Sequence, residues 1–167
     1  MRNALIVVGV DGSEGGRRAL RWAMQQAFHS GAAVEAITAW GGEQTGRSHD
    51  RATGEASERT DTLASREDAV RLLEREVQRV LDEWVSTPPP LAREVVEGQP
   101  AQVLVEAATD AAMLVLGSHG HGNPGHVTLG SVTEACVRHG SCPVVVVPVP
   151  HPERYRHEAQ DVVPIES

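Results

Sequence analysis

The chain has 167 residues, a formal net charge of -8 and a hydrophobic content of 40%. This length suits one domain with a sizeable core, and the composition is that of a globular protein. The negative charge argues against nucleic acid or an anionic membrane as a partner, and no apolar run approaches the ~20 residues that span a bilayer. The N-terminus lacks the length and cleavage site of a signal peptide, so we expect a cytoplasmic protein.

Five short runs rich in Val, Ile, Leu and Ala predict strands, at residues 5–10, 33–40, 91–96, 112–116 and 144–147. Because aromatic residues make up only 3% of the chain, the core must be built from these aliphatic side chains. Such a composition is typical of a parallel sheet that helices bury on both faces.

Four helical patterns alternate with these runs, each with apolar residues three or four positions apart. The first pattern contains Leu20, Ala23, Met24, Ala27 and Phe28, and the second contains Val70, Leu73, Val77, Val80, Leu81 and Trp84. The third contains Val103, Leu104, Ala107 and Ala108, and the fourth contains Val132, Ala135, Cys136 and Val137. Strand and helix therefore alternate, which predicts a doubly wound α/β domain with right-handed crossovers.

Glycine and proline mark the ends of the predicted helices. Gly31 is placed to end the first helix, residues 88–90 are three prolines that stop the second, and Pro100 suits the first turn of the third. Residues 41–66 are polar and are interpreted as a loop inserted into a domain of residues 1–150. Residues 151–167 form a polar, acidic tail.

The most informative motif is G-x2-G-x9-G-S, formed by Gly117, Gly120, Gly130 and Ser131 directly after the fourth predicted strand. Glycines without Cβ atoms let backbone N–H groups approach an anion, and a helix N-terminus presents further N–H groups and a partial positive charge. Asp11 follows the first predicted strand, so it should lie at the same edge of the sheet. Together these residues predict a split phosphate or nucleotide site.

Three segments carry a resemblance to a known family: residues 7–13 (Val-Val-Gly-Val-Asp-Gly-Ser), the G-x2-G-x9-G-S motif, and residues 142–147 (Cys-Pro followed by four valines). In these segments the chain resembles nucleotide-binding members of the universal stress protein family. The resemblance covers about residues 3 to 149. It implies a single doubly wound domain with a five-stranded, mostly parallel sheet, about four helices and strand order 3-2-1-4-5. It also implies a homodimer that pairs through the last strand, residues 144–149.

The resemblance further implies a site for ATP, ADP or AMP, with Mg²⁺ on the phosphates. Asp11 would bind the ribose, and the base pocket would be lined by Gly9, Val10 and Ala39. The loop after the fourth strand would enclose the ribose and phosphates with Leu116, Gly117, Ser118, His119 and Gly120. The phosphates would be held by Gly130, Ser131 and Val132. His121 and Pro124 depart from the family pattern, which commonly has a basic and a large apolar residue there.

Each of these residues also has an ordinary structural interpretation. Asp11 could cap the first helix, Gly117 and Gly120 could be turn glycines, and Ser131 could be an N-cap. The edge of the last strand could be covered by the tail rather than by a second chain.

Two residue patterns could in principle be metal sites. Cys136, His139 and Cys142 form a C-x2-H-x2-C pattern that lacks a fourth ligand, which favours ordinary thiols. His119, His121 and His126 lie in one loop, but no nearby carboxylate or cysteine completes a ligand set. Neither pattern by itself predicts a metal centre.

Two classes of function are compatible with the sequence. The first is a stress or regulatory protein that binds an adenine nucleotide and hydrolyses it slowly at most, since no Walker lysine and no evident catalytic base are present. The second is an enzyme of the same architecture, such as a nucleotidyl transferase, an ATPase or a flavin carrier. A dimer that acts as a binding module without a ligand is a third interpretation, and the retained glycines and Ser131 argue against it.

Overall fold

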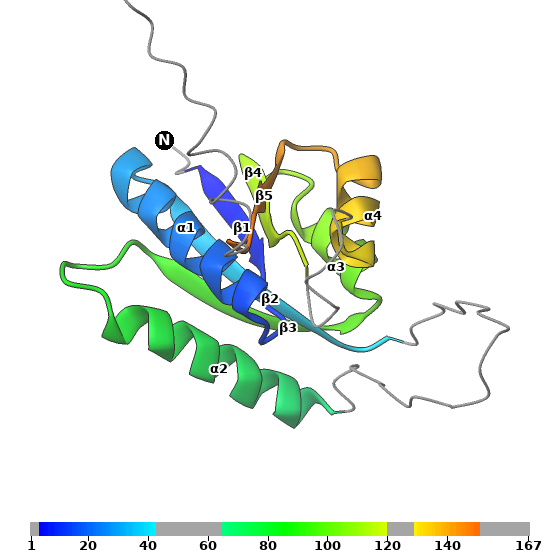
Figure 1. Ribbon diagram of the computed structural model, residues 1–167, viewed down its shortest axis with the longest axis horizontal. Helices are drawn as coiled ribbons and strands as arrows, with labels where there is room; N and C mark the ends of the chain where they lie inside the picture. Colours follow the sequence, from blue (N-terminus) through cyan, green and yellow to red (C-terminus); the bar gives the residue numbers. More distant parts are fainter. Residues whose placement is uncertain (1–3, 43–64, 120–128, 151–167) are drawn as a thin grey trace, which may run out of the picture.

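The computed structural model describes residues 4–42, 65–119 and 129–150, which form one sheet flanked by helices (Figure 1). The strands are β1 Leu5–Gly9, β2 Ala33–Gly41, β3 Leu91–Gly98, β4 Met113–Gly117 and β5 Val144–Val147. The helices are α1 Glu14–Ser30, α2 Arg66–Asp82, α3 Pro100–Ala107 and α4 Ser131–His139. The strand order is β3-β2-β1-β4-β5, and every neighbouring pair is parallel. The predicted α/β fold and strand order are confirmed.

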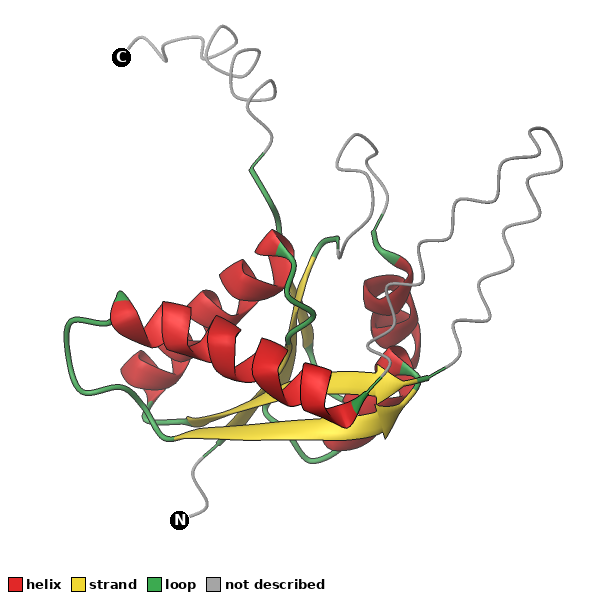
Figure 2. Ribbon diagram, turned by 90° about the horizontal axis from the view of Figure 1, so that it is seen from below, coloured by secondary structure: helices red, strands yellow, loops and turns green. Residues whose placement is uncertain are grey.

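The sheet separates two hydrophobic clusters, one under α1 and α2 and the other under α3 and α4 (Figure 1, Figure 2). Val7 and Val8 show how one strand contributes to both clusters, because successive side chains on a strand point to opposite faces of the sheet. Val8 packs in the first cluster and Val7 in the second, and neither is exposed. This double burial explains why the strands are nearly continuous runs of aliphatic residues.

The helix ends follow local capping chemistry. Ser13 and Ser65 are the N-caps of α1 and α2, and their hydroxyl oxygens accept hydrogen bonds from the backbone N–H groups of Gly16 and Asp68. Gly31 ends α1 in the left-handed conformation with φ 71°, as predicted. The capping signal at Ser65 was missed because the second helix was recognised only from its apolar positions.

The apolar pattern of α1 is wrong at Phe28. That side chain is 49% exposed, and it packs edge-on against Trp84, which lies beyond the end of α2. The pattern of α2 missed Glu76, whose side chain is fully buried beside Val77. Periodicity cannot predict this carboxylate, because its burial depends on arginine partners, one of them in another helix.

Strand ends also differ from the prediction by a few residues. β2 extends to Gly41 and β3 to Gly98, and these two residues are register partners. Pairing between neighbouring strands therefore carried both strands past their last apolar residue, as backbone hydrogen bonds do not depend on side-chain polarity. Within residues 4–42, 65–119 and 129–150, no helix is long and apolar enough to cross a membrane.

Candidate functional site

The residues of the predicted site cluster at the carboxyl edge of the sheet centre. β1 and β4 are parallel neighbours, so the chain leaves both strands at the same edge. Asp11 follows β1, and Ser118 follows β4. Two helices, α1 and α4, begin after these strands and direct their N-termini to that side (Figure 1). The fold thus brings together the two parts of the predicted site, Asp11 and the segment after β4, which are about 100 residues apart in the chain.

Asp11 organises the turn that leads into α1. One carboxylate oxygen, Oδ1, accepts hydrogen bonds from the backbone N–H of Ser13 at 2.9 Å and from its hydroxyl at 2.5 Å. The Ser13 hydroxyl oxygen in turn accepts from the N–H of Gly16 at 3.0 Å. The alternative in which Asp11 itself is the N-cap of α1 is therefore wrong, because Ser13 is the N-cap. Asp11 remains exposed, with its carboxylate held at the site edge.

Gly117 is required by packing against α1. A Cβ on Gly117 would lie 2.5 Å from the carbonyl carbon of Gly15, and a Cβ on Gly15 would lie 2.4 Å from the carbonyl oxygen of His119. The backbone of α1 therefore rests directly on the end of β4 and the start of the following loop. Sequence reasoning assigned the missing Cβ of Gly117 to space for a ligand, but Gly15 occupies that space.

Two buried threonine hydroxyls fix the carbonyls at the ends of these strands. Thr38 on β2 donates to the carbonyl oxygen of Val10 at 2.8 Å, and Thr133 on α4 donates to that of Gly117 at 2.8 Å. Both threonines are at most 5% exposed. Sequence reasoning missed them, although Thr38 stands within the apolar run of β2, which is a signal that a buried acceptor is nearby. The two hydrogen bonds join β2 to the end of β1 and α4 to the end of β4.

Among the residues that the structure describes, no side chain caps the N-terminus of α4. Gly130 occupies the N-cap position with φ -61° and ψ 153°, and as a glycine it has no side chain to accept a hydrogen bond there. Ser131 is the first residue of the helix and is exposed, so the interpretation of Ser131 as an N-cap is wrong. The N–H of Gly130 donates to the carbonyl oxygen of Ser118 at 2.9 Å, which holds the helix start beside the end of β4. The first N–H groups of α4 therefore point into this region without a capping side chain.

The remaining predicted residues line the same edge or fall outside the described residues. Ala39 on β2 and Val132 on α4 are partly buried on the α3–α4 side of the sheet. Leu116 is buried, and its side chain lies against the position of a Cβ on Gly9. Gly120 lies outside the residues that the structure describes, as do three loop residues singled out above, His121, Pro124 and His126.

His119 has an unusual environment. Its Nδ1 lies 3.1 Å from the hydroxyl oxygen of Ser118, and Ser118 is only 8% exposed. Its Nε2 is buried and has no hydrogen-bond partner among the described residues. A buried imidazole nitrogen without a partner costs free energy, so this atom is suited to accept or donate a bond to a ligand or to water.

The cysteine and histidine pattern near α4 does not assemble into a cluster. Among the described residues, no three His, Cys, Asp or Glu side chains lie where they could hold a metal ion. Cys136 is buried under α4, and burial raises the pKa of its thiol to about 11. Cys142 is partly exposed, and its sulfur lies near the carbonyl oxygen of Pro143. The two cysteines are thus free thiols with different environments.

Comparison with known proteins identifies the family. The sequence matches the universal stress protein family over residues 4–148, and the chain belongs to that family. Universal stress protein Rv2005c of Mycobacterium tuberculosis is 31% identical over 147 residues, which cover 87% of this chain and 45% of the relative. Universal stress protein Rv1996 of the same organism is 31% identical over 150 residues, or 89% of this chain and 45% of the relative. The chain therefore spans about half the length of the curated relatives it matches.

Solved structures show the same fold. A universal stress protein crystallised in complex with cAMP has 25% sequence identity and a TM-score of 0.60, and the match covers 90% of this chain and 100% of that one. Hypothetical protein MJ0577 has a TM-score of 0.65 at 23% identity, over 90% of this chain and 99% of that one.

Proposed function

We propose that this chain binds ATP or a related adenine nucleotide at the carboxyl edge of β1 and β4, and acts as a nucleotide-dependent stress-response or regulatory protein. The observation that carries the proposal is the uncapped N-terminus of α4, held beside the end of β4 and facing the same edge as Asp11. The structural relative in complex with cAMP supports an adenine nucleotide as the ligand.

In this proposal each element has a separate task. Asp11 accepts hydrogen bonds from the ribose hydroxyls, while Gly9, Val10 and Ala39 border the base. The backbone N–H groups at Gly130, Ser131 and Val132 bind the phosphates, aided by the positive end of the α4 dipole. Mg²⁺, when bound, would neutralise phosphate charge. Local dipoles are needed for this task because the chain as a whole carries a net charge of -8.

The loop after β4 would enclose the sugar and phosphates. Leu116 and Gly117 end β4, Ser118 and His119 begin the loop, and Gly120 belongs to the same motif. The unpartnered Nε2 of His119 is a candidate contact for the ligand. No residue is assigned to activate water, so we expect hydrolysis that is slow at most.

Mass spectrometry and calorimetry test this proposal. Nucleotide released by denaturing the purified protein should be an adenine nucleotide, and titration with ATP and Mg²⁺ should show binding. Asp11→Ala should weaken nucleotide binding about tenfold, because the variant loses a hydrogen bond to the ribose and the hydrogen bonds that hold the turn before α1. Glu14→Ala is the matched control, because Glu14 is a nearby exposed carboxylate within the first turn of α1.

Absence of both released nucleotide and calorimetric binding would rule the function out. Equal changes in the two variants would show that Asp11 makes no specific contact with the nucleotide. Incubation with ATP separates the second class of function: ATP that stays intact for hours supports a binding protein, whereas rapid conversion to ADP supports an ATPase.

We also propose that the chain forms a homodimer through β5 and the residues that follow, 144–149. β5 is an edge strand that pairs with β4 alone among the described strands, and its four residues are all valine. An apolar edge with unpaired backbone groups favours pairing with another strand, and a second copy would supply one. Sedimentation of the chain truncated after Pro150 distinguishes this dimer from an edge covered by the tail. A truncated chain that stays dimeric supports β5 pairing, whereas a monomer contradicts it.

A further inference from the structure

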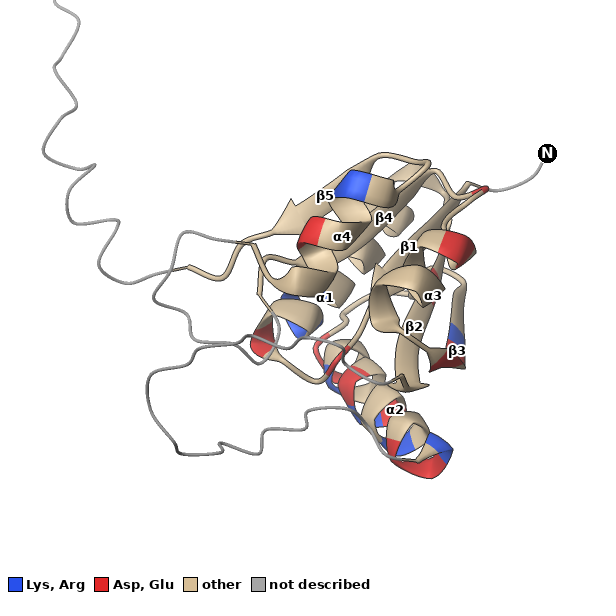
Figure 3. Ribbon diagram, turned by 90° about the vertical axis from the view of Figure 1, so that its right-hand side faces the viewer, with Lys and Arg blue, Asp and Glu red and all other residues tan. Residues whose placement is uncertain are grey.

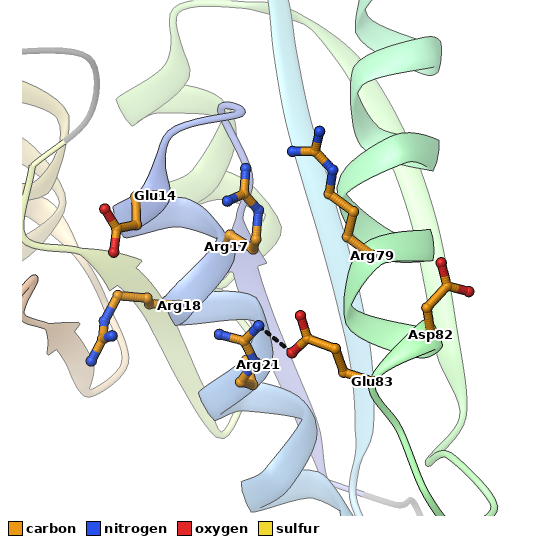
Figure 4. A pocket seen from close by; sticks show the side chains of 7 residues that line it. All are labelled: Glu14, Arg17, Arg18, Arg21, Arg79, Asp82 and Glu83. Carbon is orange, nitrogen blue, oxygen red and sulfur yellow. Dashed lines mark hydrogen bonds and ion pairs between the residues drawn. The ribbon is translucent and has the colours of Figure 1, made fainter.

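A groove lies between α1 and α2, on the face of the sheet opposite α3 and α4 (Figure 4). Its volume is about 530 Å³, within the range of sites for small ligands. All of its lining residues are charged: Glu14, Arg17, Arg18, Arg21, Arg79, Asp82 and Glu83. None of the residues assigned to the nucleotide site lines it. Figure 3 shows that acidic and basic residues gather on α2.

A buried carboxylate lies behind this groove. The side chain of Glu76 is 0% exposed, and its Oε2 accepts a hydrogen bond from Nε of Arg17 at 2.7 Å. Its Oε1 accepts from Nε of Arg75 and Nη1 of Arg79, both at 3.3 Å. The hydrogen bond to Glu76 raises the pKa of Arg17 above its ordinary value. Three guanidinium groups thus surround one carboxylate, which leaves two positive charges in excess.

The network also fixes the directions of the guanidinium groups. Arg17 and Arg79 come from different helices, and Glu76 holds both toward the same point between α1 and α2. Each donates from one nitrogen to Glu76, while a guanidinium carries five N–H donors. Their side chains are 26% and 51% exposed, so further donors reach the groove. A preorganised pair of this kind loses little entropy when an anion binds.

The three acidic residues that line the groove bond to residues other than Arg17 and Arg79 or lie away from the space between the helices. Glu83 forms an ion pair with Arg21, and Asp82 accepts a hydrogen bond from Gln78 at 2.7 Å. Figure 4 shows the Glu14 carboxylate on the side of α1 that faces away from α2. Glu14 and Glu83 still act electrostatically on Arg17, so the groove offers directed guanidinium donors rather than a large net positive charge.

We infer that this groove binds a small phosphate-bearing anion between Arg17 and Arg79. Guanidinium groups match the oxygen geometry of phosphate through paired N–H donors. No aliphatic or aromatic residue lines the groove, which favours a compact polyanion over a nucleoside. The inference is independent of the proposed nucleotide site, because the two sites share no residue.

NMR titration of the protein labelled with ¹⁵N-arginine tests the inference, with inorganic pyrophosphate as the probe and with and without saturating ATP. We expect the Nε signals of Arg17 and Arg79 to shift in both titrations. Arg79→Gln should weaken pyrophosphate binding about tenfold, as expected for one lost charged hydrogen bond. Arg138→Gln is the matched control, because Arg138 is an exposed arginine on α4 that pairs with Glu134. Urea unfolding of each variant checks that the fold is retained.

Three outcomes would overturn the inference. The first is the absence of any shift at Arg17 and Arg79 up to millimolar pyrophosphate. The second is equal weakening by the Arg79 and Arg138 substitutions. The third is citrate binding as tight as pyrophosphate, which would show attraction to charge without selection for phosphate. ATP binding is measured in the same samples, so failure of this groove is distinguishable from failure of the nucleotide site.

Discussion

Replacement of Gly117 by alanine should destabilise the protein even when no ligand is bound. The new Cβ would lie 2.5 Å from the carbonyl carbon of Gly15, whereas ordinary van der Waals contact is 3.4–4 Å. The backbones of α1 and β4 would have to separate by about 1 Å, and overpacking of this kind costs ~1–3 kcal/mol. The cost lies toward the upper end, because neither backbone can rotate away as a side chain can. Alanine also lowers the entropy of the unfolded chain, which offsets ~0.4–1 kcal/mol.

The expected net loss is therefore about 2 kcal/mol in the free energy of unfolding. Urea denaturation of the nucleotide-free protein measures it. Gly31→Ala is a useful comparison, because Gly31 has φ 71° but nothing within 4 Å of a Cβ. It should lose about 1 kcal/mol from backbone strain alone. The packing argument is refuted if Gly117→Ala leaves the unfolding midpoint unchanged and weakens only nucleotide binding, since the Cβ would then face the ligand.

Three further predictions follow from buried groups. Cys142 should react with a thiol reagent at neutral pH well before Cys136, whose raised pKa keeps it protonated, and mass mapping of the labelled peptides checks this order. Burial, and next the neighbouring Glu94, raise the pKa of Glu35 above its ordinary value of 4.5, so the folded state holds this proton more tightly than the unfolded state does. This contribution to stability is full below the ordinary pKa and is lost as the pH rises through the folded pKa. Glu35→Gln should accordingly raise the free energy of unfolding by roughly 0.5 kcal/mol at neutral pH and leave it unchanged in acid, as urea titrations at both pH values would show; a gain of equal size in acid contradicts the argument. Thr38→Val should lower the free energy of unfolding by about 1–2 kcal/mol, because it leaves a buried carbonyl without its hydroxyl donor. Thr38→Ser keeps the hydroxyl and should retain most of that stability, and thermal unfolding of the two variants measures the difference.

The order of elements was readable from local patterns. Aliphatic runs such as residues 144–147 predict strands that are buried on both faces, and alternation with helices predicts a doubly wound sheet. Gly31 was correctly placed at the end of α1, because a helix end of this kind needs a left-handed residue. These signals act over one or two turns of chain, so they are complete in the sequence itself.

Errors arose where a residue's environment depends on a distant segment. Glu76 is buried because Arg17, 59 residues away, reaches its carboxylate, and helical periodicity contains no such information. Phe28 has the spacing of a core residue but is 49% exposed and packs against Trp84. The choice between Asp11 and Ser13 as the N-cap of α1 was instead a local one, and the structure decides it because the Asp11 carboxylate accepts hydrogen bonds from the Ser13 N–H and hydroxyl.

The sequence alone therefore determined the α/β fold and the residue types of the glycine motif for which phosphate binding is proposed, because strand composition and glycine spacing are local properties. The tertiary structure decided which of those residues meet. It brought Asp11 and Gly117 to one edge through the pairing of β1 with β4, and it showed that Gly117 makes room for Gly15. It also assembled the arginines of α1 and α2 around one buried carboxylate, since side chains on separate helices become neighbours only when both helices pack on the same face of the sheet.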